Sequence, residues 1–268
     1  MPGVTVFQAA VLGVVQGLTE FLPISSSAHI ILVRDLLGWE AGAAEIPFDV
    51  VCHLGTLLAI LLYFRDDVAA LIVAAPAALT GQPGDTARLG RLIVIATVPL
   101  ALVGWLFGDV IERLRTPAVA AAALSVGAVA MLLAERVASR RRDGASLSMV
   151  EAAALGLAQA AALVPGVSRS GAVITAALVT GLRREEGARF AFLLGIPAIL
   201  GAGARVAWTL GPNGLSDHTT VLLVGFAASG VVGYLAVAGL LRYLASHTLN
   251  IFAYYRLALA AALGIWLA

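Results

Sequence analysis

Charged residues are scarce in this chain, and lysine is absent. Only 12% of the 268 residues are charged, and all 17 basic residues are arginines, whereas a soluble domain carries about 25% charged residues. The formal net charge of +1 argues against a nucleic-acid partner. The single cysteine, Cys52, cannot form an intrachain disulfide, and its place in an apolar run predicts a small buried side chain.

Long hydrophobic runs make up much of the chain. Hydrophobic residues make up 60% of the chain, and the mean hydropathy is +0.96. A helix that crosses a ~30 Å hydrocarbon core needs about 20 mostly apolar residues, so these runs predict an all-α polytopic integral membrane protein. The six predicted transmembrane helices are residues 47–64, 92–108, 117–134, 190–208, 219–241 and 251–268. Residues 1–22 lack the basic start and the cleavage site of a signal peptide, and we expect them to belong to the mature protein.

Four further apolar segments are short or interrupted. They are residues 4–22, 27–38, 149–164 and 170–182. Apolar stretches of this kind are often re-entrant. Irregular backbone at membrane depth is tolerated only where protein buries it or where it lines a water-filled cavity. We therefore expect two re-entrant helix pairs, one in each half of the chain.

Each predicted pair is broken by a polar motif. The first motif covers residues 16–29 and contains Glu20, several serines and His29, and the second covers residues 165–175 and contains Arg169. Ionisable groups at membrane depth are expensive and mark a functional site by default. The two motifs therefore predict where the activity of this protein resides.

The motifs lie in a weak internal repeat. Residues 12–16 align with residues 155–159, and after a one-residue gap residues 23–26 align with residues 165–168. Each half then holds one re-entrant pair and three spans, and because three is odd, the halves must be inverted in the membrane. Interrupted segments at matching places in inverted halves point to a site where the halves meet. The predicted halves are residues 1–143 and 144–268.

The arginines predict the orientation of the chain. Four of them fall on one side of the predicted topology, at Arg34, Arg113, Arg115 and Arg205. Eleven fall on the other side, in residues 65–91, 135–148, 181–189 and 242–250. The arginine-rich side is therefore cytoplasmic, and both termini with residues 108–117 and 209–218 are extracytoplasmic. The polar pocket is expected to open to the extracytoplasmic side, where the first re-entrant pair enters. The basic run at residues 140–142 is interpreted as topogenic charge, with contact to anionic lipid as the alternative.

Around the motifs, the sequence resembles the bacterial undecaprenyl-pyrophosphate phosphatase family, often called bacitracin-resistance proteins. The resemblance rests on residues 12–29, 165–170 and 48–51, on Thr175 and on the Tyr255-Arg256 pair. The family has Glu or Gln at the position of Gln16. The resemblance implies an enzyme of the bacterial plasma (inner) membrane that removes the terminal phosphate from C55 isoprenyl pyrophosphate. The product is the lipid carrier of peptidoglycan synthesis, which links the activity to cell-wall biogenesis and bacitracin resistance.

Cleavage of a pyrophosphate needs groups that hold and stabilise negative charge. Arg169 suits this role because its planar guanidinium grips phosphate oxygens bidentately; the alternative is a structural ion pair with Glu20. Gly166 would let backbone approach a ligand, and Ser168 and Ser170 open a half-helix whose free N–H groups favour an anion. Both serines are also candidates for helix capping. The predicted substrate-binding residues are Gln16, Ser27, Gly166, Ser168, Ser170 and Thr175.

Ser26 is the predicted nucleophile. The resemblance implies this position, and Ser26 shares a helix face with His29 three residues later. A serine nucleophile needs a base, and we expect either Glu20 or His29 to serve. The predicted catalytic residues are Ser26, Glu20, His29 and Arg169. Ser25 and Ser27 are alternatively turn and cap residues.

Glu20 has a second predicted role. It is a candidate ligand, together with substrate phosphate oxygens, for a divalent cation such as Mg²⁺ or Ca²⁺. It also shares a helix face with Gln16, four residues earlier. No organic cofactor is expected, because no nucleotide-binding fingerprint is present.

Other polar residues carry weaker signals. Asp49 and His53 share a helix face and either pair with each other or support the site. Arg256 is expected to snorkel to the membrane surface, and Gln159 to hydrogen-bond exposed backbone at the second break. Broken helices in inverted repeats are also transporter architecture, so a secondary transporter or lipid flippase is the alternative function. The partners expected are a polyprenyl pyrophosphate, membrane lipids and, because Gly and Ala allow close helix packing, a second copy in a homodimer.

Overall fold

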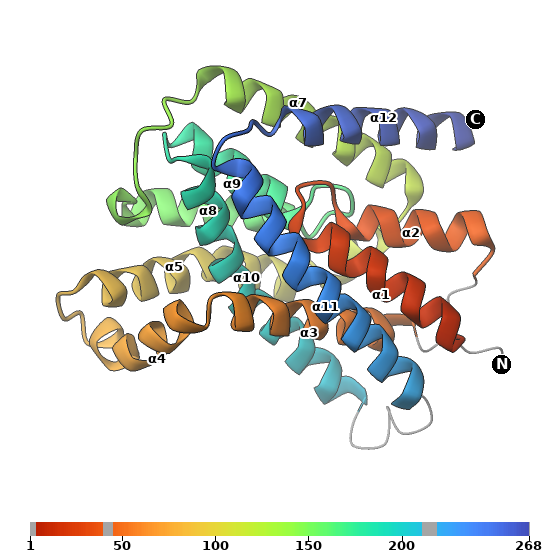
Figure 1. The fold of residues 1–268 in the computed structure, drawn as a ribbon, viewed down its shortest axis with the longest axis horizontal. Coiled ribbons are helices and arrows are strands. Elements are labelled where there is room, and N and C mark those ends of the chain that lie inside the picture. Colours follow the sequence, from red (N-terminus) through yellow and green to blue (C-terminus); the bar gives the residue numbers. More distant parts are fainter. Residues whose placement is uncertain (1–3, 40–44, 211–218, 268) are drawn as a thin grey trace.

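The computed structural model describes residues 4–39, 45–210 and 219–267. Apart from one isolated bridge between Arg142 and Leu182, the regular structure of these residues is helical (Figure 1). The helices are α1 (Val6–Phe21), α2 (Ser26–Leu37), α3 (Glu45–Tyr63), α4 (Arg65–Leu79), α5 (Asp85–Leu106), α6 (Gly108–Arg113), α7 (Pro117–Val137), η1 (Gly144–Ser146), α8 (Met149–Ala161), α9 (Arg169–Val179), α10 (Arg184–Leu210), α11 (Thr219–Leu244) and α12 (Asn250–Leu267). Most of the predicted connection at 209–218 lies outside the described residues.

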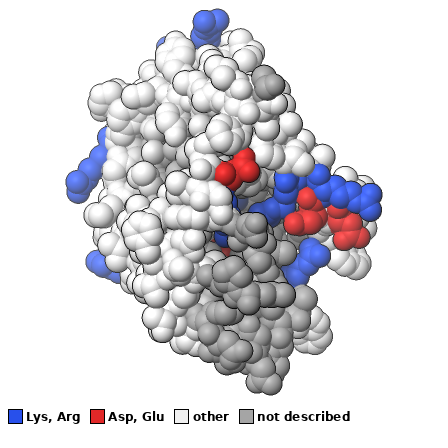
Figure 2. All heavy atoms as spheres, turned by 90° about the vertical axis from the view of Figure 1, so that its right-hand side faces the viewer, with Lys and Arg blue, Asp and Glu red and all other residues white. Residues whose placement is uncertain are grey.

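Five described helices are long and apolar enough to cross a membrane, namely α5, α7, α10, α11 and α12. They match five of the six predicted spans and confirm an all-α polytopic membrane protein. The sixth predicted span is α3, whose apolar part, Phe48–Tyr63, is shorter than those of the other five. The end of the molecule at the right of Figure 1 has a mostly uncharged surface, with acidic and basic side chains in a few groups (Figure 2).

The two predicted breaks are present. The first separates α1 from α2, and the second separates α8 from α9. Both turns lie near the middle of the molecule in Figure 1, where α2 runs back towards the end that carries both termini. The hydroxyl of Ser170 in α9 donates to the carbonyl of Leu22, 3.2 Å away, so the two breaks are in direct contact.

A helix occupies part of the predicted connection 65–91. This helix, α4, forms a hairpin with α5 at the left of Figure 1. Asp66 and Asp67 in its first turn complement the helix dipole, and alanine and leucine favour helix along its length. At 15 residues it is too short to be recognised as a span. Ile72 and Val73 are 69% and 82% exposed, which fits contact with lipid.

The helix caps reveal the register of the internal repeat. Thr5 caps α1 with a capping box, and Ser148, 143 residues later, caps α8 in the same way. Ser25 (φ 73°) precedes α2, and Ser168 (φ 68°), again 143 residues later, precedes α9. The one-residue gap in the sequence alignment is therefore wrong. Ser25 corresponds to Ser168, and Ser26 corresponds to Arg169.

Glycines let the first helix of each pair pack against a long helix of the other half. A Cβ atom at Gly13 of α1 would lie 2.7 Å from the Gly225 carbonyl oxygen in α11, and one at Gly156 of α8 would lie 2.3 Å from the Ala96 carbonyl oxygen in α5. Gly13 and Gly156 are equivalent in the 143-residue register. The pairing of α1 with α11 and of α8 with α5 therefore joins the two halves.

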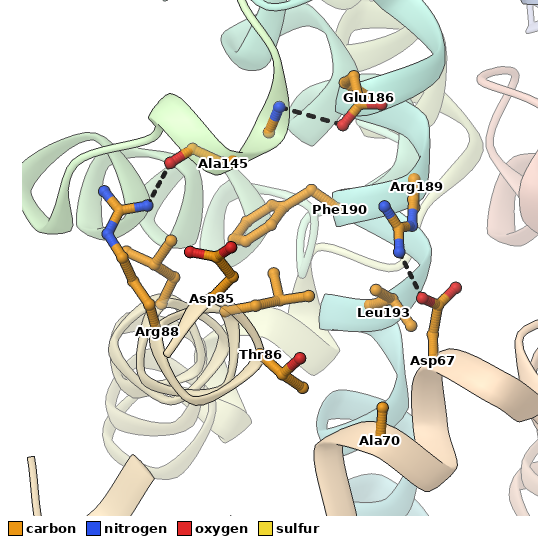
Figure 3. Close-up of a pocket in the computed structure, with 13 residues that line it drawn as sticks. Asp67, Ala70, Asp85, Thr86, Arg88, Ala145, Glu186, Arg189, Phe190 and Leu193 are labelled. Atoms are coloured by element: carbon orange, nitrogen blue, oxygen red, sulfur yellow. Dashed lines mark hydrogen bonds and ion pairs between the residues drawn. The ribbon is translucent and has the colours of Figure 1, made fainter. Parts of the chain in front are cut away.

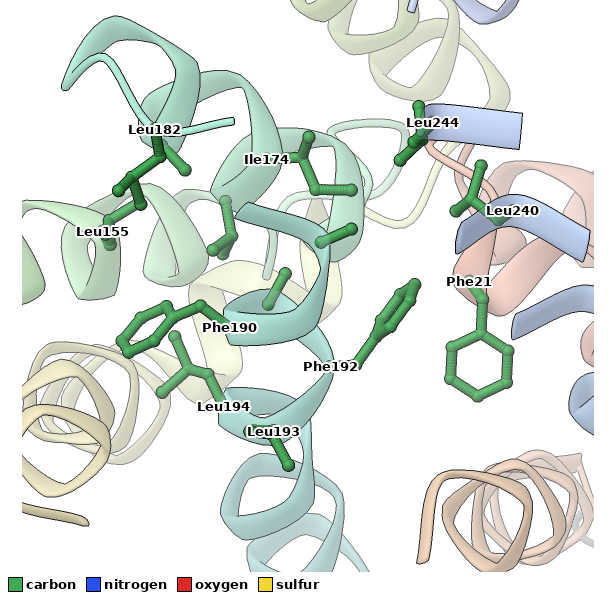
Figure 4. Packing of buried hydrophobic residues seen from close by; sticks show 14 of the residues in the cluster. Phe21, Leu155, Ile174, Leu182, Phe190, Phe192, Leu193, Leu194, Leu240 and Leu244 are labelled. Atoms are coloured by element: carbon green, nitrogen blue, oxygen red, sulfur yellow. The ribbon is translucent and has the colours of Figure 1, made fainter. Parts of the chain in front are cut away.

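The largest hydrophobic cluster surrounds α10 (Figure 4). Phe192 of α10 meets Phe21, the last residue of α1, edge to face with ring centroids 5.4 Å apart. Ile174 of α9 and Leu240 of α11 are buried in the same cluster. Both breaks are thus anchored to one core, which holds them at a defined separation.

The arginine run in the linker makes specific contacts within the protein. Arg142 forms a bidentate pair with Glu151 of α8 (2.6 and 3.1 Å), and Arg140 binds Glu135 at the end of α7 (3.0 Å). Glu135 also pairs with Arg184 of α10. The interpretation of this run as topogenic charge alone is therefore incomplete, since two of its three arginines also tie the linker to helix ends.

Candidate active site

A cavity of about 320 Å³ lies beside the two breaks. Six of the predicted site residues line it, namely Gln16, Glu20, Ser26, Ser27, Ser168 and Arg169. Four predicted site residues are not among its lining residues, namely His29, Gly166, Ser170 and Thr175. The cavity combines residues from both motifs, as expected for a site between the two halves.

Glu20 is the centre of the polar network. Its Oε2 atom accepts hydrogen bonds from the Ser26 hydroxyl at 2.6 Å and from Gln16 Nε2 at 2.8 Å. Its Oε1 atom pairs with the guanidinium of Arg169, which also donates to the Gly195 carbonyl at 3.3 Å. The carboxylate is buried, and these donors offset the cost of placing its charge away from water.

The local sequence explains why these groups meet. Glu20 follows Gln16 by one helical turn, so both face the same side of α1. After Phe21 the backbone becomes extended at Leu22, and Ser25 adopts a left-handed conformation that starts α2 in a new direction. The reversal brings Ser26, the first residue of α2, back over the Glu20 carboxylate.

Two helix N-termini point at the cavity. Ser26 begins α2, and Arg169 begins α9. The first N–H groups of a helix lack intrahelical partners and favour an anion. Ser168 caps α9 by accepting from the backbone N–H of Gly171 at 3.2 Å, which confirms the capping alternative for this residue while leaving it in the cavity wall. The arrangement can hold a phosphate between two helix ends and a guanidinium.

His29 does not face Ser26. Its Nδ1 atom lies 2.7 Å from the Ser25 carbonyl oxygen, and its Nε2 atom lies 2.7 Å from the Tyr255 hydroxyl. The rings of His29 and Tyr255 also stack, with centroids 5.6 Å apart. The i, i+3 relation puts two residues on neighbouring turns without fixing where the side chains point, and here the contacts of His29 are with Ser25 and α12. The geometry favours Glu20 as the base.

Three predicted binding residues of the second motif do not line the cavity. Gly166 (φ 94°) packs on α7, where an added Cβ would lie 2.3 Å from the Ala120 carbonyl oxygen. We expected this glycine to let the backbone come close to a ligand, but it lets the backbone come close to α7. Ser170 donates to the first break, as described above, and Thr175 lies in the second turn of α9. Gly166 and Ser170 thus have structural contacts, with a helix and with the first break.

His53 and Asp49 of α3 belong to the site, and sequence reasoning had left their role open. His53 Nε2 lies 3.4 Å from Glu20 Oε2, while His53 Nδ1 lies 2.8 Å from the backbone carbonyl of Asp49. The Asp49 carboxylate accepts two hydrogen bonds from the Arg34 guanidinium, at 2.8 and 3.2 Å, and the Arg115 guanidinium lies 3.9 Å away. The helical spacing of Asp49 and His53 was the available signal, but it could not identify Glu20 as a partner.

Arg256 is not at the membrane surface. It is 1% exposed, and its guanidinium donates to backbone carbonyls of both breaks, to Pro23 at 3.4 Å and to Gly166 at 3.1 Å. It also donates to Ala123 and Leu124 of α7, each at 3.2 Å. The snorkelling interpretation was wrong, because the unwound turns offer carbonyl acceptors that satisfy the cation inside the protein.

The cavity residues do not form a preformed metal site. The described residues contain no group of three or more His, Cys, Asp or Glu side chains that could hold an ion. Both oxygens of Glu20 already have donors, one of them a guanidinium, and Asp49 is held by Arg34. These positive neighbours disfavour a cation at Glu20.

A second, smaller cavity of about 210 Å³ lies at the linker end, between α4, α5, η1 and α10 (Figure 3). Arg88 turns away from its centre and donates to the carbonyls of Ala145 and Leu147, and Arg189 pairs with Asp67. The contacts of Arg88 join α5 to the linker, and the Arg189–Asp67 pair joins α10 to α4. The cavity has neither the serines nor the convergent half-helices of the larger one.

The fold defines the class of this protein, a polytopic membrane protein in which a buried carboxylate, serines and a guanidinium meet between two broken helices. The chain also matches the family model described as bacitracin resistance protein BacA over residues 9–262. It belongs to this family.

Curated relatives are similar over nearly their whole length. A protein of Rubrobacter xylanophilus is 45% identical over 95% of each chain. A protein of Alcanivorax borkumensis is 44% identical over 98% of this chain and 99% of its own, and one of Geobacter metallireducens is 44% identical over 93% of each. All three carry the name undecaprenyl-diphosphatase.

Proposed function

We propose that this protein is a membrane phosphatase that hydrolyses undecaprenyl diphosphate to the monophosphate and free phosphate. The observation that carries the proposal is the Glu20 carboxylate, which binds the Ser26 hydroxyl on one oxygen and the Arg169 guanidinium on the other. This is an activated hydroxyl beside a phosphate-binding cation. The family and the names of the relatives support the same chemistry.

The first step is phosphoryl transfer to Ser26. The Ser26 hydroxyl gives its proton to Glu20 Oε2, 2.6 Å away, and its oxygen forms a bond to the terminal phosphorus. The bond from this phosphorus to the bridging oxygen breaks, and the polyprenyl monophosphate leaves with the electron pair and the proton from Glu20. Arg169 and the N–H groups at the starts of α2 and α9 stabilise the charge that develops on the phosphate oxygens.

The second step is hydrolysis of the phosphoserine. Water gives a proton to Glu20 while its oxygen attacks phosphorus. The bond between phosphorus and Ser26 Oγ breaks, the serine takes up a proton, and phosphate leaves. Glu20 thus serves as base in both steps, and its contacts with Gln16 and His53 orient the carboxylate.

The site is proposed to open to the extracytoplasmic side of the bacterial inner membrane. This orientation follows from the positive-inside rule applied to the arginines and places both termini and the first re-entrant pair outside. The lipid tail would stay in the bilayer or between helices while the diphosphate enters the cavity. A homodimer is compatible with this arrangement.

Phosphate release from undecaprenyl diphosphate by the purified protein tests the function. Ser26→Ala should abolish release, because a methyl group cannot replace a nucleophilic hydroxyl. Ser27→Ala is the matched control; Ser27 lines the same cavity but has its hydrogen bond with Ser25, at 3.1 Å, so this variant should remain active. Acid quenching with substrate labelled in the terminal phosphate should trap label on Ser26. Substantial release by Ser26→Ala would exclude covalent catalysis and leave direct attack by water that Glu20 activates.

A further inference from the structure

The Gln159 side chain is fully buried and has no hydrogen-bond partner. It is 0% exposed, and neither its Nε2 nor its Oε1 atom has an acceptor or donor among the described residues. Buried polar groups are almost always paired, because an unpaired one loses its bonds to water without replacement. Gln159 therefore does not bind the backbone of the second break, as its sequence position suggested.

The internal repeat explains why this amide is left without a partner. In the 143-residue register, Gln159 of α8 corresponds to Gln16 of α1. Gln16 gives its amide proton to Glu20, one turn further along. The residue one turn after Gln159 is Leu163, which offers no side-chain acceptor. The same position of the fold thus supplies a paired amide in one half and an unpaired amide in the other.

The unpaired amide belongs to the wall of the active-site cavity. Gln159 lines it together with Glu20, Ser26 and Arg169. Since no part of Gln159 is exposed to water, a ligand reaches its amide only when neighbouring side chains move. The Arg169–Glu20 ion pair is the contact that a diphosphate would replace, because phosphate competes for the guanidinium.

We propose that Gln159 is a substrate-binding residue whose Nε2 donates a hydrogen bond to an oxygen of the diphosphate. This inference rests on the proposed function, since it names a further ligand of the same substrate. The two halves then have different roles in binding and catalysis. The first half contributes the base and the nucleophile, and the second contributes Arg169 and Gln159 as phosphate ligands.

Gln159→Leu tests this inference with two measurements on the full-length protein in detergent. Leucine is apolar and similar in size, so it removes an unpaired amide, and the melting temperature without ligand should stay equal or rise. The affinity for a non-hydrolysable polyprenyl methylenediphosphonate should fall by roughly tenfold or more. KM for undecaprenyl diphosphate should rise by a similar factor, with a smaller change in kcat.

Gln16→Leu provides the contrast. It removes an amide that has a protein partner, so its melting temperature should fall. A Gln159→Glu variant places a carboxylate against the phosphates and should weaken analogue binding more than Gln159→Leu does. If Gln159→Leu fails to fold, analogue binding by Gln159→Glu tests the inference.

The outcomes separate the inference from the function. If the wild type releases phosphate but analogue affinity and KM are unchanged in the Gln159 variants, the inference is wrong and the function stands. A lower melting temperature of Gln159→Leu with unchanged affinity would also overturn it, because the amide would then have a structural partner such as a bound water. If the wild type binds the analogue through Gln159 without releasing phosphate, the function is wrong and the binding role stands.

Discussion

The breaks in the helices leave backbone groups without helical partners, and several individual residues act on these groups. Ser25 and Ser168 hold a left-handed backbone that is costly for a residue with a Cβ atom, and each starts a half-helix that faces the cavity. The turns that they create leave carbonyl groups without helical partners. Arg256 fills this need from α12 by binding one carbonyl of each break. It is a positioning residue, since it touches both motifs without lining the cavity.

Arg256→Lys should lower both stability and turnover. Lysine keeps the charge but lacks the planar fork that reaches four carbonyls, and hydrogen bonds from a charged group contribute about 1.5–3 kcal/mol each. We expect a clear fall in melting temperature and a loss of kcat larger than any change in KM, because the breaks carry the reacting groups. Arg242→Lys, at an exposed position near the end of α11, is the control. Wild-type stability and turnover in Arg256→Lys would show that the two breaks are held together by other contacts.

At the scale of elements, the important packing is between the short apolar helix before each break and a long helix distant in the sequence. Gly156 allows α8 to approach the backbone of α5, as Gly13 does for α1 and α11. Small residues are the usual way to bring helices close in membranes. Because α8 leads directly to the second break, its packing on α5 helps to position the segment that precedes Arg169.

Gly156→Ala should destabilise the protein. The added Cβ would lie 2.3 Å from the Ala96 carbonyl oxygen, a backbone atom that cannot turn away, and overpacking of this kind costs about 1–3 kcal/mol. Gly239→Ala in α11 is the matched control, since nothing lies within 4 Å of its Cβ position and alanine favours a helix. Melting temperatures in detergent should fall for Gly156→Ala and stay equal or rise for Gly239→Ala. Equal melting temperatures for both variants would contradict the close approach of α8 to α5.

At the scale of the whole molecule, two helix pairs with matching caps, α1–α2 and α8–α9, meet at one site, and their equivalent residues are 143 positions apart. The caps, breaks and glycines come in equivalent pairs, as do the amides Gln16 and Gln159, but the nucleophile, the base and the guanidinium do not. Ser26 corresponds to Arg169, and Glu20 corresponds to Leu163. The site is therefore asymmetric although the scaffold repeats, which fits an enzyme with distinct acid–base and binding sides better than a transporter with two similar gates.

The proposed orientation can be tested by cysteine labelling in intact cells. A membrane-impermeant thiol reagent should react with Asp109→Cys, in the predicted extracytoplasmic connection, and should not react with Ser146→Cys, in the linker. Both positions are exposed, and the native Cys52 is buried, so the parent protein serves as the control. Labelling of Ser146→Cys alone would reverse the orientation and place the site opening in the cytoplasm.

The sequence alone determined the membrane class, the two breaks and the identity of the central residues. These follow from hydrophobic length and from polar groups that are too costly at membrane depth to occur without a reason. Glu20 and Arg169 were found in this way, Ser26 and Gln16 rested also on the family resemblance, and the structure brings the four together. The register of the repeat was misjudged by one residue, because the helix caps that define it depend on backbone angles and hydrogen bonds that the alignment does not contain.

Only the tertiary structure decided where side chains point and what lies across from them. The His29 side chain contacts Tyr255, 226 residues away. Arg256 is buried and donates hydrogen bonds to carbonyl groups of two turns that are distant in the sequence. His53 lies beside Glu20, which belongs to another helix. Gln159 has no partner within the described part of the chain because Leu163 stands at the position where the first half has the Glu20 carboxylate. Such contacts depend on how helices from the two halves pack, and local spacing constrains only neighbours on the same helix face.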